Sequence, residues 1–208
     1  MSRIFLLRHA QSVANAKGIL AGRLPNYPLS TEGLKQREAL LDRLAEVFFD
    51  QVISSPIQRC IETIAPIYPA PQIVEDFQEV HYGDWSGKRM SSLARNRAWK
   101  EIHRNPASVR FPNGETLIEV QTRALRGVDF SVLTPSQRGK SKVKKNILIS
   151  THADVIKVLI LHALGSHLNN IDKVVIDNAS ISVLDYGAGG LRVVRVNDDT
   201  SKIKELIK

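Results

Sequence analysis

The chain has 208 residues, of which 43% are hydrophobic and 24% charged, and its formal net charge is +8. This composition is typical of one globular domain with a proper core. No apolar run approaches the roughly 20 residues that cross a bilayer. Cys60 is the only cysteine, which excludes an internal disulfide framework and a cysteine-based zinc cluster. We therefore expect a cytoplasmic protein with no membrane partner.

The excess positive charge has three interpretations, since 29 basic residues face 21 acidic ones. The simplest is a solvated basic surface, and a second is that part of the charge attracts an anionic substrate. Nucleic acid is disfavoured as a partner because aromatic residues make up only 6% and no stacking motif is visible. The densest basic run, from Arg138 to Lys145, indicates an exposed loop rather than a groove-reading helix.

The first half of the chain alternates short apolar runs with helical patterns. Strands are expected at residues 4–7, 51–54 and 73–74. Between them we expect a short helix and loop within 10–29, an amphipathic helix capped by Ser30, and a helix that starts at Ser55-Pro56 and ends near Pro66. Such alternation predicts an α/β sandwich with a mostly parallel central sheet.

The second half continues the pattern and ends in a strand pair. The expected elements are a loop over 76–87, a helix over 91–104, a turn at 111–114 followed by a helix over 115–132, a strand over 146–150, a buried helix over 152–164, and paired strands at 180–186 and 191–196. The last two strands are expected to add an antiparallel edge. No repeat or linker marks a second domain, so residues 1–208 are expected to form one.

Chemically active side chains follow the predicted strands. Arg8 and His9 come after the first strand, Arg59 comes one helical turn after the second, Glu79 lies beyond the third, and His152 directly follows the fourth. Because ligands in α/β folds gather at the carboxyl ends of the strands, we expect these five residues to share one rim. Two histidines, two arginines and a carboxylate are the groups that phosphoryl transfer needs.

Each of these residue types suits one part of that reaction. The arginine forks of Arg8 and Arg59 can grip phosphate oxygens in pairs, and the helix start at His152 favours an anion. His9 can act as the covalent nucleophile, with the neighbouring arginines disfavouring its protonation. Glu79 can protonate the leaving alkoxide and later deprotonate the incoming water.

Five ordered motifs resemble the histidine phosphatase superfamily, the clan of cofactor-dependent phosphoglycerate mutase. They are Arg8-His9-Ala10-Gln11-Ser12 with Asn15, Ser54 to Arg59 with Glu62-Thr63, Glu79 to Gly87, Pro112 to Thr116, and Ser150 to His152. The likeness covers residues 4 to about 186. It implies a three-layer α/β/α sandwich, phosphoglycerate mutase-like, whose chemistry needs no metal and no cofactor.

The resemblance also implies roles for individual residues. His9 would carry the phosphohistidine, Glu79 would be the proton donor, and Arg8, Asn15, Arg59 and His152 would hold the phosphate. Further substrate-binding candidates lie beside them, namely Ser12, Gly22, Thr151 and Ala153. The segment of about 88–114 is expected to form a lid. Its cations either recruit an anionic substrate or form a solvated face, and they are Arg95, Arg97, Lys100, Arg104 and Arg110.

The chain departs from the family pattern at two places. Ala10 stands where the family usually has glycine, and we expect the extra methyl group to be tolerated. Ala153-Asp154 replaces the common Gly-Gly after the second histidine. Asp154 either places a negative charge near the anion site or faces a basic group nearby.

The sequence therefore predicts a metal-independent phosphatase that hydrolyses a small phosphorylated metabolite through a phosphohistidine on His9. The alternative is a cofactor-dependent phosphoglycerate mutase, which would have a longer insertion after the Glu79 motif. A binding-only relative would have lost a key residue, and a metal-dependent hydrolase using His9, His81 and His152 lacks a compact ligand motif. The substrate stays open, and a homodimer is compatible with the pattern.

Overall fold

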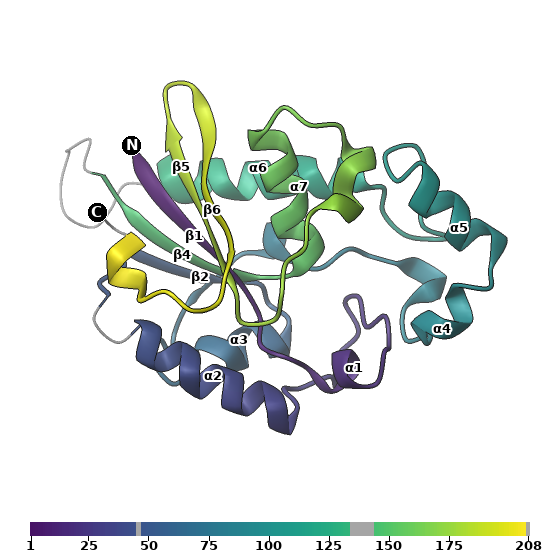
Figure 1. The fold of residues 1–208 in the computed structure, drawn as a ribbon, viewed down its shortest axis with the longest axis horizontal. Helices are drawn as coiled ribbons and strands as arrows, with labels where there is room; N and C mark the ends of the chain where they lie inside the picture. The colour runs from purple at the N-terminus through teal and green to yellow at the C-terminus, as the bar shows by residue number, and fades with distance from the viewer. Residues whose placement is uncertain (45–46, 134–143, 207–208) are drawn as a thin grey trace.

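The computed structural model describes residues 1–44, 47–133 and 144–206. Within these ranges, six strands form a single sheet in the order β3-β2-β4-β1-β5-β6 (Figure 1). Their bounds are Ser2–Arg8 (β1), Gln51–Ser54 (β2), Gln72–Ile73 (β3), Asn146–Thr151 (β4), Ile181–Gly187 (β5) and Gly190–Asp198 (β6). Strands β1 to β4 run parallel, β5 is antiparallel to β1, and β6 is antiparallel to β5. The mostly parallel sheet with an antiparallel edge is confirmed.

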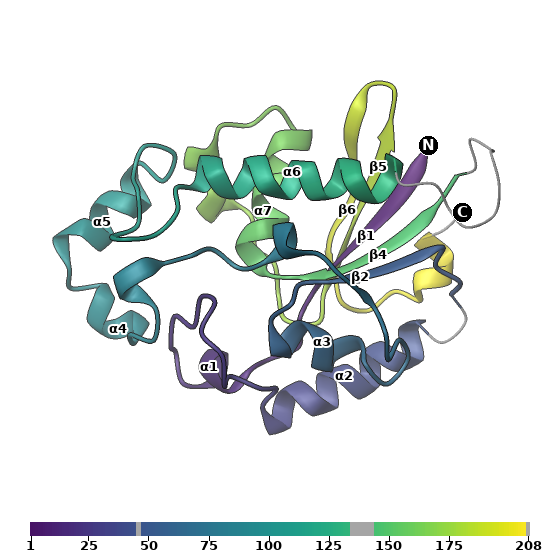
Figure 2. The ribbon, with the colours of Figure 1, turned by 180° about the vertical axis from the view of Figure 1, so that it is seen from behind.

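Helices cover both faces of this sheet. Helices α2 (Thr31–Leu44) and α3 (Gln58–Ile64) lie on one face, and α6 (Leu117–Leu133) and α7 (Ala153–Ala163) lie on the other (Figures 1 and 2). Successive residues of β1 therefore enter different cores, because side chains alternate along a strand. Ile4 and Leu6 pack with the buried face of α7, whereas Phe5 and Leu7 pack with that of α2. The predicted α/β/α sandwich is confirmed.

The parallel register aligns the carboxyl ends of three central strands. Arg8 at the end of β1 pairs with Thr151 at the end of β4, and Ser54 at the end of β2 pairs with Ser150. Backbone bonds continue this alignment by one residue, since the N–H of His9 donates to Thr151 at 3.0 Å and the N–H of Ser55 to Ser150 at 2.9 Å. The residues directly after the strands therefore meet at one edge.

The expected starts and lengths of some helices are wrong. Helix α3 begins at Gln58, not at Ser55-Pro56, because Ser55 still follows the sheet ladder and Ile57 is extended. The expected helix over 91–104 is two short ones, α4 (Met90–Leu93) and α5 (Arg97–Arg104). The break comes at Asn96, whose side chain accepts a hydrogen bond from the N–H of Ala98 and so starts a new helix.

Other local expectations are confirmed. The Ser30 hydroxyl caps α2 by accepting from the N–H of Gly33 at 3.0 Å. Helix α7 is buried as its apolar composition indicates. The basic run from Arg138 to Lys145 lies mostly outside the described residues. In the part of the chain that is described, no helix is long and apolar enough to cross a bilayer.

The smaller helices lie beyond the carboxyl ends of the strands. Helix α1 (Val13–Ala16) follows β1, and α4 and α5 extend away from the sheet on the same side (Figures 1 and 2). Aromatic contacts tie this outlying segment to the core. The Trp99 ring lies 5.4 Å from that of Trp85, which in turn lies 5.8 Å from Phe111. Segment 88–114 therefore borders the edge at which the active-site candidates meet.

Candidate active site

A cavity of about 310 Å³ opens at the carboxyl ends of the strands. Four of the five predicted catalytic residues line it, namely Arg8, His9, Arg59 and Glu79. His152 is fully buried and does not line the cavity itself; it contacts the buried side of Arg59. The five residues, which the sequence places after four different strands, are thus brought together.

The His9 ring is held in one tautomer. Its Nδ1 lies 2.7 Å from the carbonyl oxygen of Ala10, and because a carbonyl only accepts, Nδ1 carries the hydrogen. The lone pair is then on Nε2, where it accepts a hydrogen bond from Nε of Arg59 at 3.0 Å. Burial, and then the charges of Arg59 and Arg8, lower the His9 pKa well below its ordinary value. The ring is therefore neutral, with its lone pair on Nε2.

Arg59 connects the two histidines and retains one unused donor. Its Nη2 donates to the carbonyl of Gly22 at 3.0 Å and to Nδ1 of His152 at 3.1 Å. Its Nη1 is buried without a hydrogen-bond partner in the described structure, and so is Nε of Arg8. An unpaired buried donor is costly, by about 1–3 kcal/mol. Anionic oxygens in the cavity would satisfy both donors, so the residues fit a phosphoryl group.

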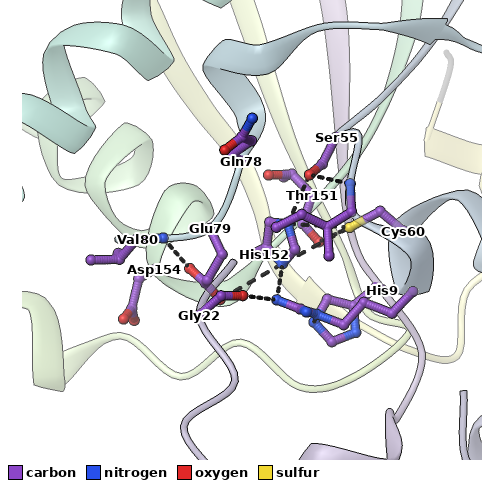
Figure 3. A network of polar contacts seen from close by, with 12 residues as sticks. His9, Gly22, Ser55, Cys60, Gln78, Glu79, Val80, Thr151, His152 and Asp154 are labelled. Carbon is purple, nitrogen blue, oxygen red and sulfur yellow. Dashed lines mark hydrogen bonds and ion pairs between the residues drawn. The ribbon is translucent and has the colours of Figure 1, made fainter. Parts of the chain in front are cut away.

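His152 orients Arg59 through a tautomer of its own. Since Arg59 donates to Nδ1, the hydrogen of the neutral ring lies on Nε2, which donates to the Ser55 hydroxyl at 2.9 Å (Figure 3). Burial and the Arg59 charge lower the pKa of His152 well below its ordinary value. Beside it, burial raises the pKa of the Cys60 thiol to about 12. The thiol of this fully buried residue therefore stays protonated.

Glu79 lies near the ring nitrogen of His152 that does not contact Ser55. Its side chain is 12% exposed. One carboxylate oxygen accepts from the N–H of Val80 at 2.9 Å, and the other lies 3.7 Å from Nδ1 of His152 (Figure 3). Burial and then the negative charge of Asp154 raise the Glu79 pKa to about 7, against the opposing charge of Arg59. A carboxyl group with such a pKa can both give and take a proton near neutral pH.

Asp154 satisfies both interpretations that the sequence leaves open. It lines the cavity near Glu79, and it also faces a basic group, since one of its oxygens lies 3.3 Å from Nζ of Lys157. Its other oxygen accepts from the Tyr82 hydroxyl at 2.6 Å. Ala10 is buried with an ordinary negative φ, so its methyl group adds no backbone strain.

The motif at 112–116 holds the Glu79 segment in place. The carbonyl of Glu79 accepts from Arg23 at 2.8 Å and from Arg123 at 3.2 Å, and both arginines also bind the Glu115 carboxylate. Glu115 in turn accepts from the backbone N–H of His81 at 2.9 Å. Gly83 makes the approach possible, because a Cβ there would lie 1.9 Å from the carbonyl oxygen of Pro112. The Glu79 segment is therefore held in place through its backbone carbonyl.

The remaining candidates divide into those that line the cavity and those that do not. The lining residues are Ser12, Asn15, Gly22 and Ala153. Thr151 does not line it; its buried hydroxyl donates to the carbonyl of Phe77 at 2.8 Å. Ser12 and Asn15 form a capping box at the start of α1, which fixes both side chains.

The cations of segment 88–114 are not at the cavity. Arg95, Arg97, Lys100, Arg104 and Arg110 are exposed and do not line it, and Arg110 pairs with Glu119 at 2.6 Å. The solvated interpretation fits them.

Three other acidic or basic residues, which the sequence did not single out, line the described cavity. They are Lys157, His103 and Asp172. Lys157 could have been found from its helical spacing to Ala153 and Asp154. His103 and Asp172 have no comparable local signal.

The histidines do not assemble into a metal site. His81 is exposed and away from the cavity lining, so it does not join His9 and His152. Among the described residues, no three His, Cys, Asp or Glu side chains are placed to hold a metal ion.

Comparison with known proteins agrees with this geometry. The family model of the histidine phosphatase superfamily (branch 1) matches residues 4–199. The chain belongs to this superfamily. Phosphoserine phosphatase 1 of Hydrogenobacter thermophilus is 30% identical over 193 residues, which cover 88% of this chain and 86% of that protein. Relatives of this superfamily are named as phosphatases, which supports a phosphatase for this chain as well.

Solved structures of the superfamily share the fold. YhfR of Bacillus stearothermophilus superposes with a TM-score of 0.85 at 24% identity, covering 98% of this chain and all of that one. The α-ribazole phosphatase of Shigella flexneri superposes with a TM-score of 0.80 at 23% identity, covering 96% and 98% of the two chains. At this identity the likeness shows the phosphoglycerate mutase-like fold alone.

Proposed function

We propose that this protein is a metal-independent phosphomonoesterase that hydrolyses a small phosphorylated metabolite through a phosphohistidine on His9. One observation carries the proposal: His9, Arg8 and Arg59 line the same cavity, the lone pair of His9 is on Nε2 beside Arg59, and each arginine keeps one buried donor without a partner. A nucleophile and two anion-binding donors at one point are what in-line phosphoryl transfer requires.

The first half-reaction transfers the phosphoryl group to the protein. His9 Nε2 attacks phosphorus, the bond from phosphorus to the ester oxygen breaks, and Glu79 gives its proton to the departing alkoxide. The Nδ1–H bond to the Ala10 carbonyl stabilises the positive charge that develops on the ring. Once the His9 lone pair has bonded to phosphorus, the Nε–H of Arg59 turns toward a phosphoryl oxygen. The Nη1 group of Arg59 and the Nε–H of Arg8 bind the other phosphoryl oxygens.

The second half-reaction releases phosphate. Glu79, now ionised, takes a proton from water, and the resulting nucleophile attacks phosphorus. The bond from phosphorus to Nε2 breaks, and its electron pair returns to the ring, which is again neutral. The Glu79 pKa of about 7 suits both the donation and the later abstraction of this proton.

Phosphate release from p-nitrophenyl phosphate and from ethyl phosphate, measured with excess chelator, tests the proposal. We expect turnover in the wild type and its loss in His9→Ala, while His162→Ala, a matched change at an exposed histidine, keeps full activity. Rapid quenching should trap an acid-labile, base-stable phosphoenzyme in the wild type only. Activity that chelator abolishes, or that His9→Ala retains, would contradict the mechanism.

A further inference from the structure

The cavity changes character away from His9. Its inner end is formed by the charged groups already described, but the outer walls are apolar. These walls come from the loop after α1, from α5, from the start of α6 and from the segment Leu168–Lys173, and they include Leu20, Trp99, Ile102, Phe111, Leu117 and Ile171. In the proposed in-line displacement the ester oxygen departs on the side of phosphorus away from His9, so we place the leaving alcohol in this part of the cavity. The leaving alcohol therefore meets a mainly apolar surface.

The acidic and basic side chains of the outer cavity are in contact with one another. Lys157 lies 3.3 Å from the Asp154 carboxylate, and His103 Nδ1 lies 2.7 Å from the Asp172 carboxylate. Apart from the four residues at the inner end, these are the acidic and basic side chains that line the described cavity. A carboxylate on the leaving group would meet Lys157 with its charge already offset by Asp154, and an ammonium would meet carboxylates that already have a partner. These pairs therefore offer little attraction for a charged leaving group.

The size of the cavity and its aromatic wall indicate a large group. At about 310 Å³ the cavity exceeds what a phosphate with a short alkyl chain fills. Trp99, half-buried, is held by rings at its sides, with centroids 5.4 Å away at Trp85 and 4.8 Å away at His103. A preformed aromatic wall of this kind favours a flat ring in the ligand.

We propose that the substrate is a phosphate ester of an uncharged alcohol whose body is large, apolar and ring-containing. This inference rests on the proposed function and narrows it to a substrate class. It disfavours esters with a carboxylate or ammonium near the phosphate, such as phosphoserine or a phosphoglycerate.

Two esters with equally reactive leaving groups test the class. Both 2-phenylethyl phosphate and ethyl phosphate release a primary alcohol, so their rates differ through binding of the ring and not through leaving-group basicity. Burying a phenyl group should raise kcat/KM by about 10- to 100-fold. Phosphoserine and 3-phosphoglycerate should react no better than ethyl phosphate. Equal rates for the first pair, or a preference for the charged esters, would overturn the inference.

Variants of Trp99 test whether this ring is responsible for the preference for 2-phenylethyl phosphate. Trp99→Ala should lower the ratio of kcat/KM for 2-phenylethyl phosphate to that for ethyl phosphate by about tenfold, and Trp99→Phe should restore most of it. Ile118→Ala, at an exposed apolar residue of α6 outside the cavity lining, should leave the ratio unchanged. A ratio that Trp99→Ala does not alter would contradict the proposed wall.

Asp154→Asn tests the pairing argument. In this variant Lys157 has lost its carboxylate partner and is free to bind an anion. The ratio of kcat/KM for 3-phosphoglycerate to that for ethyl phosphate should therefore rise several-fold. Both are esters of primary alcohols, so any change in proton donation affects them alike. A ratio that stays constant would show that Asp154 does not mask Lys157.

A binding measurement separates this inference from the proposed function. In the His9→Ala variant, which cannot form the phosphoenzyme, calorimetry should show 2-phenylethyl phosphate binding about ten times more tightly than ethyl phosphate. If the wild type hydrolyses none of the esters, the proposed function fails, and this comparison still decides the substrate class. Equal affinities in the variant would overturn the class even where turnover is observed.

Discussion

Nε of Arg59 donates to Nε2 of His9 at 3.0 Å, so the cation that favours phosphate binding also covers the lone pair proposed to attack it. Burial, and then the Arg59 charge, lower the His9 pKa and keep the ring unprotonated, while this bond holds the ring in place. An entering phosphate offers the guanidinium stronger, charge-assisted bonds and thereby frees the lone pair. In the proposed mechanism, substrate binding and release of the nucleophile are thus coupled through the Arg59 side chain.

Replacement of Arg59 by lysine should be nearly as damaging as its removal. Lysine is a point charge without a fork, so it cannot contact His9, Gly22 and His152 together. We expect kcat/KM for ethyl phosphate to fall by about 10²- to 10³-fold. Arg126→Lys, at an exposed arginine of α6, is the matched control and should change little. An Arg59→Lys variant with near-normal kcat/KM would show that the fork is not needed.

The pH dependence should follow the proton on Glu79. Because its pKa is about 7 and the protonated form donates to the leaving group, kcat/KM for ethyl phosphate should decline above about pH 7. Glu79→Gln should remove this decline and lower the rate by about 10²- to 10⁴-fold, with a smaller loss on p-nitrophenyl phosphate, whose leaving group needs no acid. Glu75→Gln, at an exposed neighbour, is the control. A decline that persists in Glu79→Gln must come from another group.

Asp154 should set the position of that decline. Its negative charge disfavours ionisation of Glu79, so removing the charge in Asp154→Asn lowers the Glu79 pKa. The fall in kcat/KM should therefore move to lower pH, and the ratio of variant to wild-type kcat/KM should decrease between about pH 6 and 8. Taking this ratio cancels the ionisation of the substrate itself. A shift toward higher pH would contradict the stated electrostatics.

Gly83 should be intolerant of a side chain. It has a φ of +54°, and a Cβ would meet the carbonyl oxygen of Pro112 at 1.9 Å, so either the backbone strains or the Glu79 and Glu115 segments separate. We expect Gly83→Ala to lower the free energy of unfolding by about 2–4 kcal/mol in urea titration. Gly189→Ala, where no atom lies within 4 Å, should change it by less than about 0.5 kcal/mol. Equal stability of the two variants would contradict the close approach.

Much of the fold and the inner site follows from local sequence pattern. Short apolar runs between amphipathic segments predict a parallel sheet between helix layers, and the carboxyl ends of parallel strands meet at one edge. His9 and His152, each directly after a strand, could therefore be placed together from sequence order alone. The cap at Ser30 was equally accessible, because a capping hydroxyl acts within three residues.

Only the tertiary structure decided how those groups engage one another. Arg59 reaches His9 across 50 residues and His152 across 93, and no periodicity encodes which guanidinium nitrogen meets which ring nitrogen. The pairing of His103 with Asp172 and the apolar outer cavity likewise come from segments that meet only on folding. Helices and the tendency of a segment to form a strand are indicated by side-chain patterns a few residues apart. Strand pairing, pKa values and specificity depend instead on groups that the whole chain brings close.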